Sequence, residues 1–160
     1  MNRLLIAAAL AASFVASPLF AQAPPPPYGP AITFDAARKA IAAAEAEAKK
    51  NNWPVAIAIV DSAGQLAAFS KMDNTQHASV DIAIGKAVTA NNLKRPTKAL
   101  QDAIAQGGAG LRLLAVKDIT PLEGGVPIVV DGKIIGAIGV SGVASNQDAD
   151  VAMAGAAAAK

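Results

Sequence analysis

Apolar side chains recur at helical spacing over residues 34–50 of this chain and then give way to the continuous runs that are typical of strands. Alanines dominate the apolar face of the first segment, so we expect a helix over residues 34–50 with Thr33 as its N-cap. Residues 55–60 are apolar throughout and rich in β-branched side chains, which predicts a buried strand. After a turn at residues 61–64, residues 66–72 are expected to return beside it as a second strand.

The rest of the chain predicts three more helices and three more strands. Two residues, Asp131 and Gly132, separate the last two apolar runs, which predicts a hairpin with a type I′ turn. Gly107 is expected to end a helix, and Ser145 or Asn146 to cap the final one. The order α-β-β-α-α-β-β-β-α, with hairpins and grouped helices, predicts an α+β domain around an antiparallel sheet. The expected elements are helices at residues 75–91, 95–106 and 145–159, and strands at residues 111–116, 126–130 and 133–140.

The first residues resemble an export signal. A positive start ending at Arg3 precedes an uncharged apolar run and then small residues. The apolar run is shorter than the roughly 20 residues that a transmembrane helix needs. We expect a signal peptide over residues 1–21, with cleavage after residue 23 as an alternative, a proline-rich leader over 22–31 and one domain over 32–160. This organisation predicts a periplasmic or secreted protein; an uncleaved N-terminal anchor is the other interpretation.

Composition narrows the kinds of site that the domain can hold. The chain has 160 residues with one His and no Cys, which excludes disulfides, cysteine zinc sites and iron–sulfur clusters. A net charge of +2 without a basic cluster gives no electrostatic footprint for nucleic acid. The hydrophobic content of 53% is too high for a disordered chain. The chemistry must therefore come from few residues in one compact domain.

One glycine-rich stretch comes just before the expected hairpin near the end of the chain, and a second begins within its last strand. Gly136, Gly139 and Gly142 do not have the spacing of a nucleotide-binding loop, and two of them fall inside an expected strand. We expect them to allow close packing of a helix or of a neighbouring subunit. Gly124 and Gly125 free the backbone for positive φ and exposed N–H groups, which suits either a tight structural loop or a ligand-binding loop.

His77 is the single imidazole and therefore the candidate metal or haem ligand, although a lone histidine is more often a surface residue. Met72 and Met153 are weaker candidates, because methionine usually fills core space. No nucleophile motif such as G-x-S-x-G is present. Several charged residues suit binding of a cation or a carboxylate if they meet at one end of the sheet, whereas solvated surface charge is the more common outcome. These residues are Asp61, Lys71, Asp73, Asp81 and Lys86.

Ordered motifs over residues 33–159 carry a resemblance to a known family. They are Pro54 to Asp61 with Gly64, Lys71-Met72-Asp73, Ser79-x-x-x-Ala83-x-x-Lys86-Ala87-x-Thr89-Ala90 with Pro96-Thr97, Gly124-Gly125-x-Pro127-Ile128, Asp131-Gly132 with Gly136 to Gly142, and Asp150-x-x-Met153-Ala154. Together they resemble the GlcG/HbpS-like haem-binding family, which also includes the C-terminal domain of one type of cobalamin adenosyltransferase.

The resemblance implies a profilin-like α/β/α sandwich with a five-stranded antiparallel sheet, and assembly into homo-oligomers, octamers among them. It implies haem or iron as the ligand. Lys86, Thr89, Gly124 and Gly125 match the family motifs and are candidates for a pocket wall. Cationic side chains and the glycine loop suit the haem propionates, and His77 is the candidate axial ligand. The candidate ligand-binding residues are Lys71, Lys86, Thr89, Arg95, Glu123, Gly124 and Gly125.

Three functions follow from these residues. The favoured one is an exported haem- or iron-binding protein that carries, stores or senses its ligand. The second is a haem-degrading or peroxidase-like enzyme, for which the sequence supplies no clear distal acid–base pair. The third is a metal-free protein that binds a small carboxylate such as glycolate through the glycine loop and Lys86. We expect no nucleic-acid partner and no stable membrane insertion after cleavage.

Overall fold

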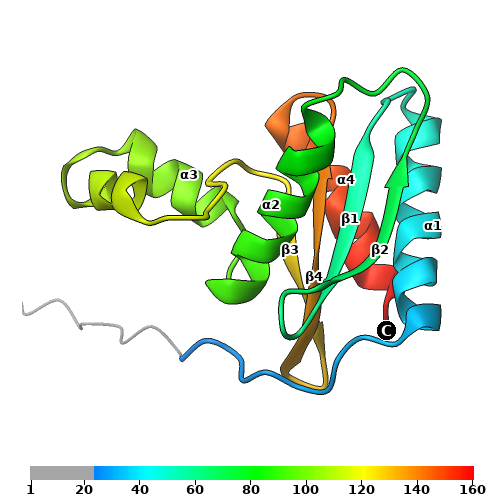
Figure 1. Cartoon of the computed structure of the whole chain (residues 1–160), viewed down its shortest axis with the longest axis horizontal. Helices are drawn as coiled ribbons and strands as arrows, with labels where there is room; N and C mark the ends of the chain where they lie inside the picture. Colours follow the sequence, from blue (N-terminus) through cyan, green and yellow to red (C-terminus); the bar gives the residue numbers. More distant parts are fainter. Residues whose placement is uncertain (1–23) are drawn as a thin grey trace, which may run out of the picture.

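A computed structural model describes residues 24–160, so the expected signal peptide lies outside the described residues (Figure 1). Four α-helices, one 3₁₀-helix and four strands follow one another in this part of the chain. They are α1 (Phe34–Lys50), β1 (Ala56–Asp61), β2 (Leu66–Lys71), α2 (Ser79–Asn92), α3 (Lys98–Ala105), η1 (Gly108–Ala115), β3 (Gly125–Val130), β4 (Lys133–Ser141) and α4 (Ser145–Ala158).

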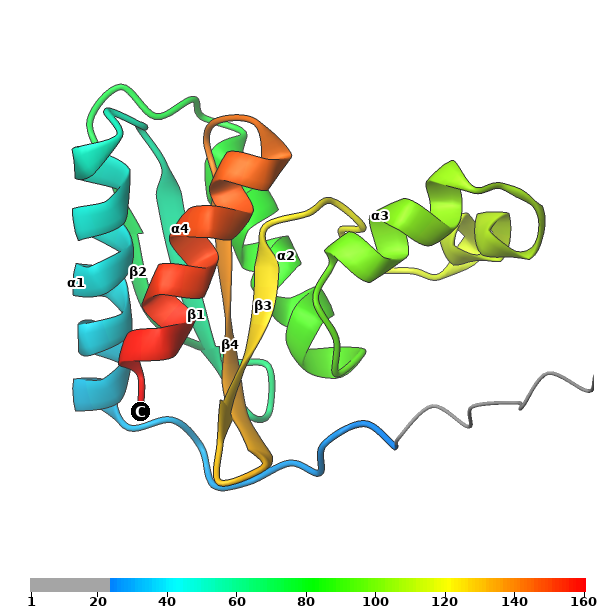
Figure 2. The same ribbon diagram turned by 180° about the vertical axis from the view of Figure 1, so that it is seen from behind.

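The strands form one antiparallel sheet in the order β2-β1-β4-β3. α1 and α4 lie side by side on one face of the sheet, and α2 lies on the other (Figures 1 and 2). Alternate residues of β1 point to opposite faces: Ile57 and Ile59 pack under α1 and α4, whereas Ala56, Ala58 and Val60 join the alanines of α2. The predicted α+β architecture with an antiparallel sheet is confirmed.

The expected strand at residues 111–116 is wrong, and the sheet has four strands rather than five. Residues 108–115 form the 3₁₀-helix η1, which follows α3 on a projection from the domain. The segment Leu111 to Ala115 includes Arg112 and contains no β-branched residue, which weakens its local preference for a strand. Gly107 and Gly108 both have positive φ and turn the chain directly into η1.

Other local predictions hold or shift by a few residues. The Thr33 hydroxyl accepts the Ala36 N–H (3.2 Å), which confirms it as the N-cap of α1. Asp131 and Gly132 have φ of 48° and 71°, as a type I′ turn requires. α2 begins at Ser79 and α3 at Lys98, later than expected, and Ala144 rather than Ser145 or Asn146 occupies the N-cap position of α4.

The predicted close packing of a helix against a strand glycine is confirmed at Gly139, whereas Gly136 meets the neighbouring strand. A Cβ on Gly139 would collide with the backbone of α2 at Ala83 and Ala87, and one on Gly136 with the carbonyl of Val60 in β1. Small residues on both surfaces therefore bring α2 directly onto the sheet.

The end of the proline-rich leader contacts the domain. Pro27 accepts a hydrogen bond from Ile134 N–H (2.9 Å), and Gly29 N–H donates to the Ile134 carbonyl (2.8 Å). The Tyr28 hydroxyl reaches the carbonyl of Asn91 at the end of α2 (2.9 Å). No helix among residues 24–160 is long and apolar enough to cross a membrane.

Candidate functional site

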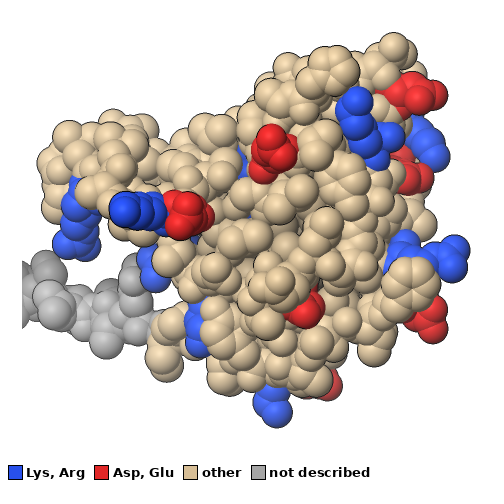
Figure 3. Space-filling model, in the orientation of Figure 1, with Lys and Arg blue, Asp and Glu red and all other residues tan. Residues whose placement is uncertain are grey.

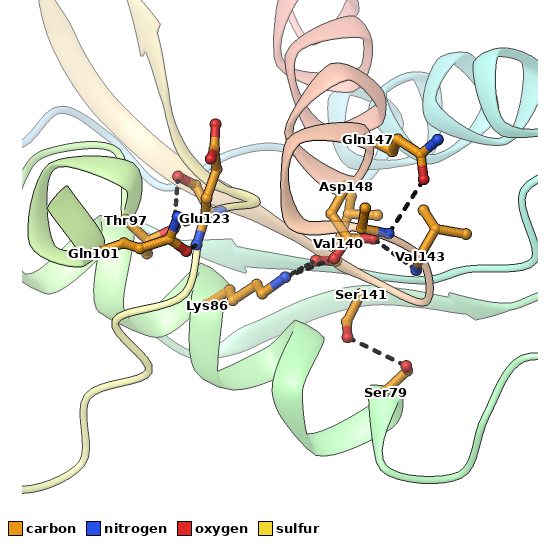
Figure 4. Close-up of polar contacts among 12 residues, drawn as sticks. Ser79, Lys86, Thr97, Gln101, Glu123, Val140, Ser141, Val143, Gln147 and Asp148 are labelled. Carbon is orange, nitrogen blue, oxygen red and sulfur yellow. Dashed lines mark hydrogen bonds and ion pairs between the residues drawn. The ribbon is translucent and has the colours of Figure 1, made fainter. Parts of the chain in front are cut away.

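Most of the sequence-predicted residues fall into two regions at one end of the sheet. The first, here called the Lys86 cluster, is a closed polar group between α2, β4 and α4 (Figure 4). Lys86 Nζ donates to Asp148 Oδ2 (2.8 Å) and to the Val140 carbonyl (2.9 Å). The side chains of Lys86 and Asp148 are only 2% and 3% exposed. The ion pair thus joins both faces of the sandwich across its interior.

Gly124 and Gly125 close over this pair. Gly124 has φ of 123°, and a Cβ there would lie 2.8 Å from Lys86 Nζ and 2.9 Å from the Asp148 Cβ. The Thr97 hydroxyl accepts the Gly125 N–H (2.9 Å), and Thr97 N–H donates to the Gly125 carbonyl (3.0 Å). The glycine loop is therefore used for close backbone packing against Lys86, and its Gly125 amide is already paired.

Opposing effects act on the pKa of the Asp148 carboxyl in this cluster. Burial raises its pKa, while hydrogen bonds from the Lys86 ammonium and the Val143 N–H (3.2 Å) act in the opposite direction. Asp148 also stands in the first turn of α4, where the helix dipole favours a negative charge. The pair is satisfied internally and needs no ligand to balance its charge.

Two more predicted residues border the cluster. Thr89 is buried, and its hydroxyl accepts the Thr120 N–H (2.8 Å). Glu123 N–H donates to the side chain of Gln101 (2.9 Å), and its carboxylate lies 4.0 Å from Lys98 Nζ. These contacts hold the chain between α3 and β3 in place, and the predicted role of the two residues in ligand binding stays a prediction.

The second region is an open hollow of about 560 Å³ beside the C-terminal end of α1 and the end of β2, which we call the Trp53 hollow. Trp53 and Met72 line it and pack against the core cluster beneath α1. Lys49 and Lys71 line it from α1 and β2. An apolar floor bordered by cations can receive an amphiphilic anion.

One carboxylate of the hollow is fixed in place. Glu45 accepts hydrogen bonds from the Ser70 hydroxyl (2.6 Å) and from Lys49 Nζ (3.2 Å). The Ser70 bond, helped by Lys49, holds the pKa of Glu45 below its ordinary value of 4.5 despite partial burial. The carboxylate ties α1 to β2 at the edge of the hollow.

The remaining candidates stand apart from these regions. His77 is exposed in the β2–α2 segment, a few residues after Asn74, which lines the hollow. Arg95 is exposed beyond α2, and its Nε donates to the Leu93 carbonyl (3.1 Å). Within residues 24–160, no group of three or more His, Asp or Glu side chains is arranged to hold a metal ion.

The sequence interpretation missed Asp148 and Trp53 as site residues. Asp148 had a weak signal, since it is an acid near the start of an alanine-rich helix, but only the fold shows that it faces Lys86. Trp53 is the single tryptophan of the chain, and it follows a helix end immediately before a strand, where an indole is well placed to line a cleft.

Comparison with known proteins agrees with this fold. Residues 32–157 match the family described as haem degrading protein HbpS-like, and the chain belongs to this family. Protein GlcG of Escherichia coli (strain K12) is 46% identical over 101 residues, which are 63% of this chain and 74% of GlcG.

Two solved structures are similar to this chain along most of their length. The complex of PduOC with haem has a TM-score of 0.73 and 32% identity, covering 80% of this chain and 94% of that one. The structure of HbpS has a TM-score of 0.74 and 32% identity, covering 81% of this chain and 90% of that one.

Proposed function

We propose that this protein binds haem and that the Trp53 hollow receives it. The observation that carries haem as the ligand is the similarity to the PduOC–haem complex, which extends over 94% of that chain at 32% identity. Membership of the HbpS-like family supports the same ligand class.

The residues of the Trp53 hollow suit the chemistry of haem. The porphyrin of haem is a flat apolar ring that carries two propionate carboxylates. Haem therefore binds best to an apolar surface with cationic side chains beside it. Trp53 and Met72 offer the apolar surface, while Lys49 and Lys71 offer the cations. The volume of about 560 Å³ lies within the range of small-molecule sites.

Two side chains of the β2–α2 segment are candidates for the iron. His77 is exposed, so its ring nitrogens are accessible, and the Met72 thioether lines the hollow. Haem, when bound, supplies iron-centred redox chemistry, and the protein residues orient it and shield one of its faces.

A hemin titration tests the proposal. We expect a shifted Soret band and quenching of the single tryptophan at micromolar hemin, with one saturating site per chain. Trp53→Ala and Met72→Ala are expected to weaken binding about tenfold, because each removes apolar contact area. Phe34→Ala, which removes an exposed apolar side chain at the end of α1 opposite to the hollow, is the matched control. Absence of a Soret shift overturns haem binding, whereas a shift unchanged in both hollow variants overturns only the location.

The axial ligand is tested separately from affinity. If His77 ligates the iron, His77→Ala changes the Soret and charge-transfer bands of the bound ferric haem, and Met72→Leu does not. An unchanged spectrum in His77→Ala excludes it as the axial ligand.

Haem degradation is the second candidate, favoured by the description of the family as haem degrading. The test is to add peroxide or ascorbate to the haem-loaded protein and follow the Soret band. Faster loss than for free hemin, with one defined product, supports an enzyme; equal loss supports a carrier, storage or sensing role.

Export and self-association complete the proposal. Amino-terminal sequencing of protein recovered from the periplasm or medium tests cleavage after Ala21, and sedimentation velocity tests assembly into a homo-oligomer. Native mass spectrometry of purified protein distinguishes haem from ferric iron alone and from a small carboxylate.

A further inference from the structure

Residues 98–122 form a projection, here called the arm, that leaves the domain next to α2 (Figures 1 and 2). Its two helices, α3 and η1, pack against each other; a Cβ on Gly110 would collide with the backbone of Ala103. Neither packs to a comparable extent against a strand or another helix. The contacts between the arm and the domain include the hydrogen bond from Thr120 N–H to the Thr89 hydroxyl (2.8 Å), and Leu100 of α3 is buried.

Large apolar side chains of the arm are exposed. Leu114 is 66% exposed and Leu111 49%. In a 3₁₀-helix, residues three apart lie one above the other, so these two leucines share one face of η1. Val116 and Leu122 add further exposed apolar surface. Short helices are stabilised mainly by packing of their apolar face, and this face of the arm is exposed. An exposed apolar patch of this kind is typical of a surface that binds a partner.

Between α2 and β2 the domain leaves an apolar surface, here called the groove, that its own helices do not cover. α2 packs on β1, β4 and β3 but not on β2. In the antiparallel register Leu66 is opposite Val60 and Phe69 opposite Ala58, so both point to the face of the sheet that carries α2. Leu66 is 52% exposed and Phe69 37%.

The other wall of this groove is α2. Ile84 and Val88 are half-buried, and they lie seven and three residues before Asn91, on the same side of the helix. Asn91 donates to the Ser62 carbonyl (3.3 Å) in the β1–β2 turn, so this side faces β2. In the space-filling view the middle of this face is largely free of charged groups (Figure 3).

We infer that the arm of one copy of this chain docks in the groove between α2 and β2 of a second copy. The inference names the surface for the self-association proposed above and does not depend on haem. The chain carries both a projecting apolar face and an uncovered apolar groove, so a second copy supplies the partner for each. Leu111 and Leu114 of one copy then cover Leu66 and Phe69 of the other.

The exposed apolar area sets an upper limit on this contact. The exposed apolar residues of the arm offer roughly 350 Å² and the groove roughly 250 Å², so a two-fold exchange of arms that covered all of them would bury at most roughly 1,200 Å². This total reaches the lower end of the range for specific interfaces before any polar rim is counted.

Sedimentation velocity of the purified protein and its variants tests the inference. Leu114→Glu in the arm and Phe69→Glu in the groove are each expected to raise the dissociation constant tenfold or more, because each places a charge in an apolar contact. Phe34→Glu is the matched control, since Phe34 on α1 is also 66% exposed and lies outside both surfaces. Circular dichroism confirms that each variant is folded.

Mixing the two variants gives a sharper result than either alone. An arm variant retains an intact groove and a groove variant an intact arm, so their mixture regains one contact and should associate more tightly than either variant alone.

Disulfide trapping provides a test that does not rely on destabilising changes. The chain has no cysteine, so Leu114→Cys in one preparation and Phe69→Cys in another should form a crosslinked pair on oxidation only when mixed. Phe34→Cys mixed with Phe69→Cys should not crosslink at the same rate. A wild-type monomer at all concentrations overturns self-association itself. An oligomer that Leu114→Glu leaves intact, without crosslinking of Leu114→Cys to Phe69→Cys, overturns only this surface.

Discussion

The Lys86 cluster and the Trp53 hollow lie at the same end of the sheet and use the same kinds of residue in opposite ways. Lys86 is buried and fully engaged with Asp148 and Val140, whereas Lys71 is exposed beside an open cavity. Gly124 and Gly125 fill the space above Lys86 with backbone, while Trp53 and Met72 leave space above them. The comparison shows that a lysine and a glycine pair with the sequence pattern of a ligand-binding loop can instead be buried contacts that hold helices to the sheet. The open cavity is lined by Trp53 and Met72, which belong to no such pattern.

Removing the Lys86 ammonium should produce the largest effect. Lys86→Met leaves the Asp148 carboxylate buried without its cation, and the free energy of unfolding should fall by about 3–5 kcal/mol. Urea unfolding measures this loss. In the double variant Lys86→Met with Asp148→Asn, the second change should add little; fully additive losses would show that the two groups do not act as a pair.

Adding a methyl group above the cluster should have the next largest effect. Gly124→Ala combines a strained φ with a collision at the Val140 carbonyl, at a cost of about 3 kcal/mol. Gly132→Ala has a positive φ but open space, and should cost about 1 kcal/mol. Thermal unfolding of the two variants separates packing from strain, and equal losses would contradict the tight closure of the glycine loop.

Neutralising the cations of the hollow should affect ligand affinity and leave stability nearly unchanged. The double variant Lys49→Gln with Lys71→Gln is expected to weaken hemin binding about tenfold, because propionates lose charged partners. Lys39→Gln with Lys133→Gln removes two exposed lysines elsewhere and serves as the control. The same loss in both variants would indicate a general charge effect rather than a site.

The smallest expected effect concerns the Glu45–Ser70 hydrogen bond. Ser70→Ala should lower the free energy of unfolding by about 1 kcal/mol at neutral pH. Because the folded-state pKa of Glu45 lies below its ordinary value of 4.5, its contribution is present above that pH and is lost as the pH falls through the lowered value. The difference between wild type and Ser70→Ala should therefore shrink in acid; a constant difference from pH 7 to pH 3 would assign the loss to packing.

The sequence by itself determined the elements whose signal is local. The alanine spacing and Thr33 defined α1, Asp131 and Gly132 defined the last hairpin, and Gly139 marked a close helix contact. Each of these features depends either on residues a few positions apart in the sequence or on a glycine, which has no side chain. The motifs of the family also placed Lys86 and Gly124 in one pattern, and the structure brings them together.

Tertiary structure alone decided the rest. An apolar run such as residues 111–116 suits a strand or a helix, and its outcome depended on the arm that the neighbouring glycines create. The partner of Lys86 is 62 residues away, and the Trp53 hollow joins the end of α1 to the end of β2. Such contacts form when helices pack on both faces of one sheet. The local sequence does not specify which distant side chains meet there and which leave a cavity between them.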